Sequence, residues 1–177
     1  QNMSEWDLEY ELSNMFLPEQ LALIDVMCIG GGLPSTYANT NVKMFDIIEK
    51  KITSLKKWLN NNSINLMIEP GRFIAAPSCE LHAKIIGIHD KTIIIDTSVY
   101  SGDMDALIVP VKLLVKGELE KTHVDACAYS IKGVTPCSLD LYRYKVYLTK
   151  KQVGDEIIFL NAGAYNFASD FCNLDVW

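Results

Sequence analysis

The sequence has 177 residues, of which 49% are hydrophobic and 21% charged, so it is long enough to fold around at least one hydrophobic core. Its formal net charge of −6 argues against a protein that holds nucleic acid or an anionic membrane through a broad basic surface. No apolar run approaches the roughly 18 residues that a membrane span needs, and no basic and then apolar leader opens the chain, so we expect a soluble, cytoplasmic protein.

Cysteines and histidines show no spacing typical of a metal site. The chain has an odd number of cysteines, none in a CxxC arrangement: Cys28, Cys79, Cys127, Cys137 and Cys172. The histidines are equally scattered: His82, His89 and His123. We therefore expect reduced thiols and no bound metal.

The opening segment, residues 4–20, is compatible with two structures. Trp6, Leu8, Tyr10 and Leu12 alternate with polar residues, as in a strand that is buried on one face. Leu8 and Leu12 also lie four residues apart, as on one face of a helix. The pattern leaves both structures open.

Residues 21–68 predict a βαβ unit. The run LALIDVMCI (21–29) is typical of a strand buried on both faces, and it ends at Gly30-Gly31-Gly32. A second apolar run, INLMI (64–68), predicts the next strand. Between them an apolar stripe at steps of three and four predicts a helix, formed by Phe45, Ile48, Ile52, Leu55 and Leu59. Such units join parallel strands, whose carboxyl ends lie on one side.

Beyond Ser78 the pattern changes to short strands separated by turns. Residues 81–88 and 92–96 flank the turn His-Asp-Lys and predict a hairpin. In 141–148, Tyr142, Tyr144, Val146 and Leu148 alternate with Arg143, Lys145 and Tyr147, and 156–160 predict a further strand. We therefore expect an α/β part at 1–78 and an all-β domain, a sandwich or barrel, at 79–177.

Two loops whose residues can bind a ligand follow the predicted parallel strands. Ligands bind beyond the carboxyl ends of such strands, so Gly30-Gly31-Gly32 and Glu69-Pro70-Gly71-Arg72 are predicted to face one site. Glycines allow positive φ and let backbone amides approach an anion, and an arginine adds donors suited to phosphate. The alternatives are a flexible turn for the glycines and a surface ion pair for Glu69 and Arg72.

Four motifs, in this order, resemble a known family: CIGGGLP (28–34), IEPGRF (68–73), GVTPCSLD (133–140) and NAGAYN (161–166). They are similar to the C-terminal portion of the pyridoxal-phosphate-dependent decarboxylases that act on ornithine, arginine and diaminopimelate, whose barrel is alanine-racemase-like. The resemblance implies the last part of a (β/α)8 barrel followed by a β domain, and pyridoxal 5′-phosphate (PLP) as cofactor.

The same resemblance implies roles for individual residues. Gly30, Gly31 and Gly32 supply amides to the phosphate, Gly71 and Arg72 flank it, and Tyr165 adds a hydroxyl. Glu69 is expected against the pyridine nitrogen. A carboxylate there favours the protonated ring, which withdraws electrons from the substrate carbon. The related racemases are known for an arginine at this position, so an acidic residue favours a decarboxylase.

The motif that supplies the proton donor departs from the family pattern. The family commonly uses a cysteine followed by an acidic residue, contributed from the partner subunit of a dimer. Aligned from Gly133 without gaps, Pro136 takes the place of the cysteine and Cys137 that of the acid. Either the loop shifts by one residue and Cys137 still donates, or Cys137 is a small apolar filler.

The segment that resembles the substrate-reading segment, residues 104–113, also differs. Diaminopimelate enzymes have an arginine before the proline, but here Val109 precedes Pro110, which argues against that substrate. Asp103 and Asp105 are offset candidates for binding a distal amine, and a solvated loop is the alternative. A basic amino acid such as ornithine, or a conjugated diamino acid, is the expected substrate.

The lysine that carries the cofactor in this family lies far upstream of the glycine loop and has no counterpart here. The chain is therefore expected to be a fragment, a subunit of a split enzyme, or a degenerate homologue, and to be inactive alone. Two parallel strands expose apolar faces and unpaired backbone, so we expect a homodimer or a complementing N-terminal chain. A non-catalytic homologue that acts as a regulatory binding protein is the alternative.

Overall fold

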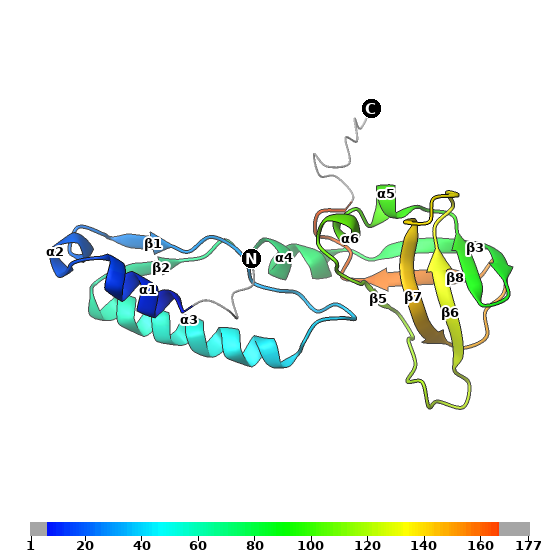
Figure 1. The fold of residues 1–177 in the computed structure, drawn as a ribbon, viewed down its shortest axis with the longest axis horizontal. Helices are drawn as coiled ribbons and strands as arrows, with labels where there is room; N and C mark the ends of the chain where they lie inside the picture. The colour runs from blue at the N-terminus through cyan, green and yellow to red at the C-terminus, as the bar shows by residue number, and fades with distance from the viewer. Residues whose placement is uncertain (1–6, 167–177) are drawn as a thin grey trace. The chain divides into compact units, whose positions relative to one another are not determined.

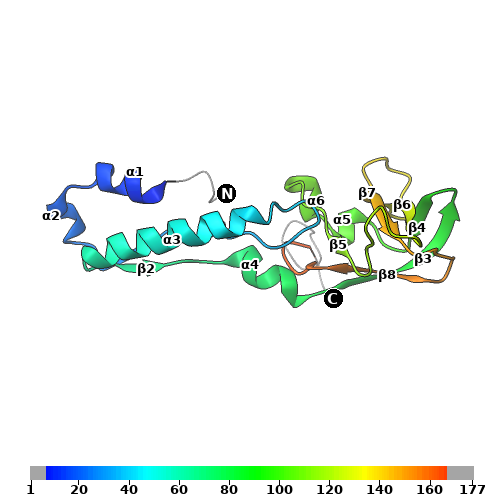
Figure 2. The ribbon, with the colours of Figure 1, turned by 90° about the horizontal axis from the view of Figure 1, so that it is seen from below.

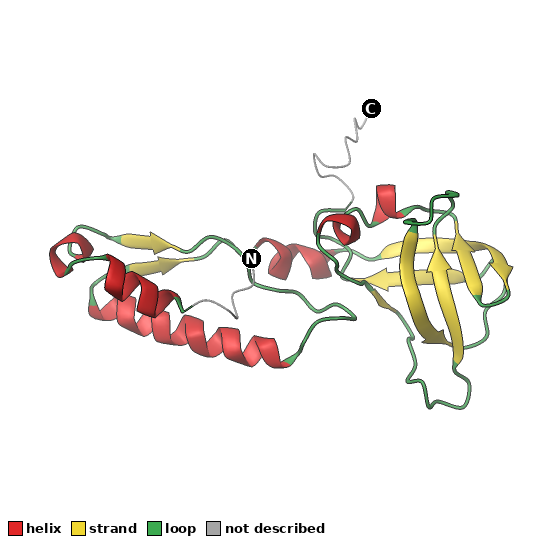
Figure 3. Ribbon diagram, in the orientation of Figure 1, coloured by secondary structure: helices red, strands yellow, loops and turns green. Residues whose placement is uncertain are grey.

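The computed structural model of the chain describes residues 7–166, which divide into two compact units (Figure 1). The first unit holds the chain up to Ser35 together with Asn41–Ile74, and the second holds Thr36–Thr40 and the chain from Ala75 onward. Helices accompany a small sheet in the first unit, whereas strands dominate the second (Figure 3). This confirms an α/β part and a β part, while the (β/α)8 barrel and the boundary after Ser78 stay predictions.

The opening segment is helical rather than extended. It forms α1 (Leu8–Met15) and the short α2 (Pro18–Leu21). Glu9 and Glu11 lie in the first turn of α1, where carboxylates are stabilised by the helix dipole. Pro18 begins α2, at a position whose N–H would have no intrahelical partner in any case. Trp6, part of the predicted alternation, lies outside the described residues.

The predicted βαβ unit is confirmed. β1 (Val26–Cys28) and β2 (Asn65–Met67) pair in parallel, with Met27 opposite Leu66. The connection contains α3 (Lys43–Asn61), the long helix in cyan in Figure 1.

The strand predicted over residues 21–29 is shorter than expected. Hydrogen bonds from the amides of Leu23 and Ile24 to the carbonyls of Gln20 and Leu21 continue the turn after α2, so pairing begins only at Val26. The prediction of burial on both faces is also wrong for this chain. Val26 is 45% exposed and Met67 49%, because α3 covers only one face of the two-stranded sheet.

The apolar stripe of α3 holds the first unit together. Figure 2 shows α1 on one side of α3 and β2 on the other. Leu55 and Leu59 are almost fully buried in a cluster with Leu21 and Ile64, against which Met27 packs. Burial of a leucine side chain stabilises a fold by about 1.5–3 kcal/mol. Leu55 and Leu59, both members of the predicted stripe, therefore contribute to the stability of the first unit.

The second unit is a six-stranded sheet of nearly closed barrel shape, with strand order β5-β8-β3-β4-β6-β7. All neighbouring pairs are antiparallel except β4 and β6. Its elements are a 3₁₀ turn (Ala76–Ser78), β3 (Leu81–His89), β4 (Thr92–Ile95), α5 (Val99–Gly102), α6 (Asp105–Ile108), β5 (Leu114–Val115), β6 (Cys127–Lys132), β7 (Leu141–Leu148) and β8 (Glu156–Leu160).

The predicted hairpin of the second unit is confirmed. β3 and β4 pair antiparallel from His89 opposite Thr92, and Asp90 takes a φ of +52° in the turn between them. Aspartate tolerates this left-handed conformation better than most residues. Ile85, Ile93 and other side chains that alternate along these strands form the core of the sheet.

The predicted alternation along β7 breaks in the middle of the strand. Its pairing with β6 shifts register on either side of Ile131, and each shift of one residue exchanges the two faces. Arg143 is therefore buried, whereas Tyr144 is 76% exposed. The Arg143 guanidinium donates to both carboxylate oxygens of Glu118, at 2.9 and 2.6 Å, and to the carbonyl of Leu113 at 2.8 Å.

Candidate functional site

The carboxyl ends of β1 and β2 stay joined beyond the strands themselves. The Ile29 amide donates to the Met67 carbonyl at 3.1 Å, and the Glu69 amide donates to the Gly30 carbonyl at 2.8 Å. Gly30 and Glu69, which lie 39 positions apart in the sequence, are thus neighbours in space, and so are the two motifs that contain them. We call Gly30, Gly31, Gly32, Glu69, Gly71 and Arg72 the strand-tip site.

Glycine is required by geometry at the strand-tip site. Gly30 and Gly32 have φ of +70° and +99°, which residues with a Cβ rarely adopt. At Gly31 a Cβ would lie 2.9 Å from the Glu69 carbonyl oxygen, closer than such atoms approach one another. This loop therefore exposes backbone where a side chain would otherwise stand.

The second half of the strand-tip site is a tight turn into a helix. The Gly71 amide donates to the Glu69 carbonyl at 2.9 Å, and α4 (Gly71–Ala75) begins there. Arg72 is half-buried and takes part in an interaction of its own, while Glu69 is exposed. The structure thus brings all six predicted residues of the first unit together, and their roles stay predictions.

Cys137 lies in the second unit, in the exposed loop between β6 and β7. The Tyr100 hydroxyl donates to its Sγ at 2.9 Å. This bond, with help from the amides of Leu139 and Asp140, lowers the pKa of the Cys137 thiol. The same bond raises the pKa of the Tyr100 hydroxyl. Cys137 is therefore an exposed, acidified thiol, and the interpretation as an apolar core filler is wrong.

Tyr165, the remaining predicted residue, also belongs to the second unit. It is 46% exposed, takes a φ of +62° and is engaged in an interaction. Its neighbour Asn166 is buried and accepts the Asp105 amide at 3.1 Å, so the motif NAGAYN is anchored to the β unit. The role of the Tyr165 hydroxyl stays a prediction.

Asp103 and Asp105 do not form a solvated loop. Both are buried, and neither Asp103 carboxylate oxygen has a hydrogen-bond partner in the described part of the chain. Burial raises the pKa of Asp103 to about 8, and the charge of Asp105 adds to the shift. A carboxylate without partners is costly to bury in charged form, so burial favours the neutral form of Asp103 below pH 8.

Two residues of the site region received no role from the sequence. Tyr100 lies in a motif that resembles nothing distinctive, so no sequence signal pointed to it. Asp140 closes the quoted motif GVTPCSLD, and an aspartate at the end of a loop that begins with glycine is a signal that could have found it.

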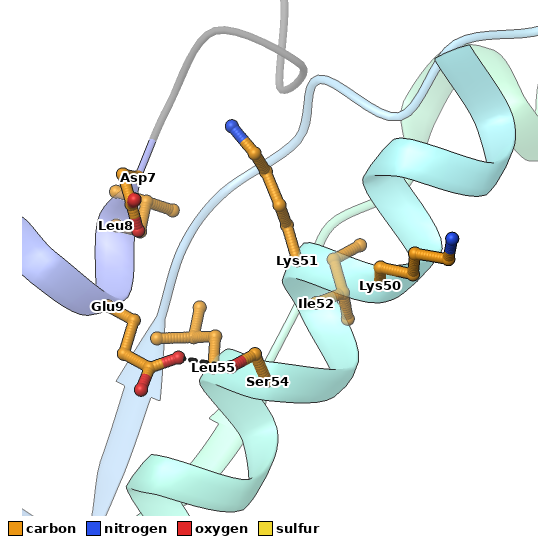
Figure 4. A pocket seen from close by; sticks show the side chains of 8 residues that line it. All are labelled: Asp7, Leu8, Glu9, Lys50, Lys51, Ile52, Ser54 and Leu55. Carbon is orange, nitrogen blue, oxygen red and sulfur yellow. Dashed lines mark hydrogen bonds between the residues drawn. The ribbon is translucent and has the colours of Figure 1, made fainter. Parts of the chain in front are cut away.

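The structure also has a surface pocket of about 270 Å³ that holds none of the predicted residues (Figure 4). Asp7, Leu8 and Glu9 line it from the start of α1, and Lys50, Lys51, Ile52, Ser54 and Leu55 from α3. A hydrogen bond from Ser54 to Glu9 joins its two walls. Its mixed charges cancel, so the pocket indicates no particular ligand.

Residues 7–166 contain neither a cluster of metal ligands nor a membrane-spanning helix. No group of three or more potential metal ligands lies together there. Within the same range, every helix is too short or too polar to cross a membrane.

Comparison with known proteins defines the class of fold. No protein-family sequence model and no curated protein sequence matches the chain. Solved structures do match it, among them decarboxylases of arginine, lysine, ornithine and carboxynorspermidine. The predicted resemblance is therefore confirmed at the level of the fold.

Three of these structures illustrate the extent of the likeness. Carboxynorspermidine decarboxylase from Campylobacter jejuni, complexed with norspermidine, has a TM-score of 0.69 and 19% identity over 94% of this chain and 47% of its own. Lysine/ornithine decarboxylase from Vibrio vulnificus, complexed with cadaverine, has a TM-score of 0.65 and 22% identity over 92% of this chain and 44% of its own. SrLDC, in complex with PLP and cadaverine, has a TM-score of 0.61 and 20% identity over 95% of this chain and 43% of its own. The chain thus spans less than half the length of each.

Proposed function

We propose that this chain is the C-terminal part of a PLP-dependent decarboxylase that acts on a basic or a conjugated diamino acid. The single observation that carries the proposal is the hydrogen bond from Glu69 to Gly30, which joins the two loops into one strand-tip site. The shared fold with decarboxylases, one of them solved with PLP, supports the same cofactor here.

The strand-tip site passes a test of fit for the cofactor. A phosphate needs closely approaching backbone donors, and at Gly30 nothing lies within 4 Å of the position that a Cβ would take, so the backbone there is open to a ligand. Gly30, Gly31 and Gly32 would hold the phosphate, with Arg72 and Tyr165 as further donors. PLP, when bound, supplies an electron sink for the loss of CO2.

The chain's own residues then have distinct tasks. The Glu69 carboxylate, exposed at the end of β2, would hold a proton on the ring nitrogen by charge attraction. Cys137 would deliver a proton from Sγ to the substrate carbon that has lost CO2. The opposite charges of Glu69 and Arg72 suit the two ends of one dipolar molecule.

The chain spans less than half the length of the decarboxylases that it matches, so it would act together with other polypeptide. Val26 and Met67 expose apolar surface on the uncovered face of the sheet, and the edges of β1 and β2 have no further strand in the described range. We therefore infer that a complementing N-terminal chain, with or without a second copy in a homodimer, completes the site and the predicted (β/α)8 barrel.

Reconstitution tests this function. The chain would be mixed with PLP, with and without a candidate N-terminal half, and the visible absorbance of covalently bound PLP recorded. CO2 release from ornithine, arginine, lysine and conjugated diamino acids would then identify the substrate. Absorbance that appears only in the mixture, followed by CO2 release, is the expected result.

A non-catalytic regulatory homologue is the second candidate. The observation that favours it is the displaced thiol, because Pro136 stands where the family has its cysteine. If no N-terminal half restores cofactor absorbance or CO2 release, this second candidate replaces the enzyme.

A further inference from the structure

Tyr100 and Cys137 form a pair between two segments that are distant in sequence. Tyr100 lies in α5, and Cys137 lies in the β6–β7 loop 37 positions later. The phenol is the donor and the sulfur the acceptor, at 2.9 Å, which is short for a bond to sulfur. Two other cysteines have longer contacts: Cys28 accepts the Gly30 amide at 3.4 Å, and Cys79 lies 3.6 Å from the Ser78 hydroxyl.

Asp140 connects the segments that carry this pair. One of its carboxylate oxygens accepts the Val99 amide at 2.9 Å, at the base of α5. The other accepts the Thr135 amide at 3.0 Å and the Thr135 hydroxyl at 2.7 Å, at the start of the β6–β7 loop. Burial works against ionisation, but these bonds and one from Ser98 prevail and lower the pKa of Asp140.

Gly133 shows how closely the loop is built around this carboxylate. A Cβ at Gly133 would lie 2.1 Å from an Asp140 carboxylate oxygen, so only glycine leaves room for it. Asp140 is fully buried, and its charge is used entirely within the chain. Its position fixes α5 and the loop to each other and thereby the distance between Tyr100 and Cys137.

We propose that Tyr100 controls the proton on Cys137, and that Asp140 positions the two residues for this task. The inference rests on the proposed function, in which Cys137 protonates the substrate carbon. In that step the S–H bond breaks and a C–H bond forms, and the electron pair of the S–H bond remains on sulfur. The Tyr100 hydroxyl, still protonated, stabilises the thiolate by its hydrogen bond, and water then returns a proton to the exposed sulfur.

This arrangement gives the displaced cysteine a means to act as an acid. A donor that stabilises the conjugate base makes a thiol easier to deprotonate. Other groups that face the sulfur have smaller effects on the Cys137 pKa. The Leu139 and Asp140 amides lower it, and the charge of the Asp140 carboxylate raises it. The phenol is thus the largest influence on the Cys137 proton, and it belongs to a different segment of the chain.

The test measures thiol reactivity of the full chain without cofactor. Wild type, Tyr100→Phe and the control Tyr144→Phe would react with iodoacetamide between pH 5.5 and 9, with mass spectrometry of the tryptic peptide 133–143, in which Cys137 is the one cysteine. Tyr144 is exposed on β7, so its variant should match the wild type. We expect Tyr100→Phe to be alkylated several-fold more slowly at pH 7, with the pH profile moved to higher pH.

A second variant tests the positioning role of Asp140. Asp140→Asn should shift the Cys137 profile in the same direction as Tyr100→Phe, because loss of the Tyr100 hydrogen bond outweighs loss of the Asp140 charge, which alone would favour the thiolate. Combining the two changes should add little. Circular dichroism shows whether Asp140→Asn is still folded. If it is not, the result for Tyr100→Phe, which removes only one hydroxyl, decides whether the inference holds. Identical profiles of Tyr100→Phe and wild type would overturn the inference. Because no cofactor is used, this outcome is distinct from failure of the reconstitution experiment.

Discussion

Gly31 lies so close to Glu69 that a Cβ on the glycine would stand 2.9 Å from the Glu69 carbonyl oxygen. The obstacle is backbone, which cannot move aside as the end of a flexible side chain can. Both loops of the strand-tip site therefore depend on the absence of a side chain at one position. Their spacing in the sequence shows nothing of this contact.

The first prediction concerns Gly31→Ala. The added methyl group must push the two loops apart, and such overpacking typically costs about 1–3 kcal/mol. We expect lower stability of the first unit in urea unfolding of the chain, and weaker PLP binding in an absorbance titration of the reconstituted complex. Gly87→Ala is the control, because a Cβ there would meet Ile94 at an ordinary 3.8 Å. Equal PLP affinity of Gly31→Ala and the control would contradict the phosphate role.

The second prediction separates the two charges of the strand-tip site. Arg72→Ala should weaken PLP retention by about 1–3 kcal/mol, the range for a hydrogen bond that involves a charge. Glu69→Gln should leave PLP bound but slow CO2 release in the reconstituted enzyme. Dialysis followed by absorbance measures retention, and turnover is measured at saturating PLP. Lys57→Ala, an exposed change on α3, serves as control. If both variants bind and react as the parent does, the assigned roles are wrong.

The sequence predicted the elements whose determinants are local. The stripe of α3 and the β3–β4 hairpin follow from apolar periodicity and turn residues within one segment. The parallel pair follows from the order strand, helix, strand along the chain. The extent of β1 did not follow, because Leu21 and Ile24 are as apolar in a helical turn as in a strand. Apolar character alone does not distinguish these two states for a short run.

The errors in the second unit have a different cause. The faces of Arg143 and Tyr144 depend on register shifts relative to β6, and these arise from pairing between strands. The burial of Asp103 and the bond from Tyr100 to Cys137 likewise join segments far apart along the chain. The strand-tip site could be predicted because its residues follow directly from the ends of two recognisable strands.

The third prediction concerns the pH dependence of stability. Asp103 binds its proton more tightly in the folded state, where its pKa is about 8, than in the unfolded state, where it is near 3.8. The folded state therefore loses stability as pH rises between these values, by at most about 1.4 kcal/mol per pH unit, and loses no more above pH 8. Asp103→Asn lacks this titration.

Urea unfolding of Asp103→Asn and wild type between pH 5 and 9 checks this expectation. The stability advantage of the variant should grow up to pH 8 and then become constant. Asp90→Asn, an exposed change in the β3–β4 turn, is the control and should follow the wild type. Parallel curves for Asp103→Asn and wild type would show that the carboxyl ionises freely in the folded state.

The last prediction concerns the ion pair that follows from the register shift in β7. Arg143→Met keeps the apolar stem but removes the donors to Glu118 and to the Leu113 carbonyl. Breaking a buried pair costs about 3–5 kcal/mol, and because the Glu118 side chain is 29% exposed and can regain water, we expect the lower end of that range.

Denaturant unfolding measures this cost, with Lys145→Met on the exposed face of the same strand as control. Glu118→Gln and the double variant complete a cycle, in which a coupling energy above about 1 kcal/mol indicates a direct interaction. A cost for Arg143→Met no greater than for the control would mean that the guanidinium is not a structural element. In that case the register shift would have to be stabilised by other contacts, such as those of the buried Ile131 and Tyr142.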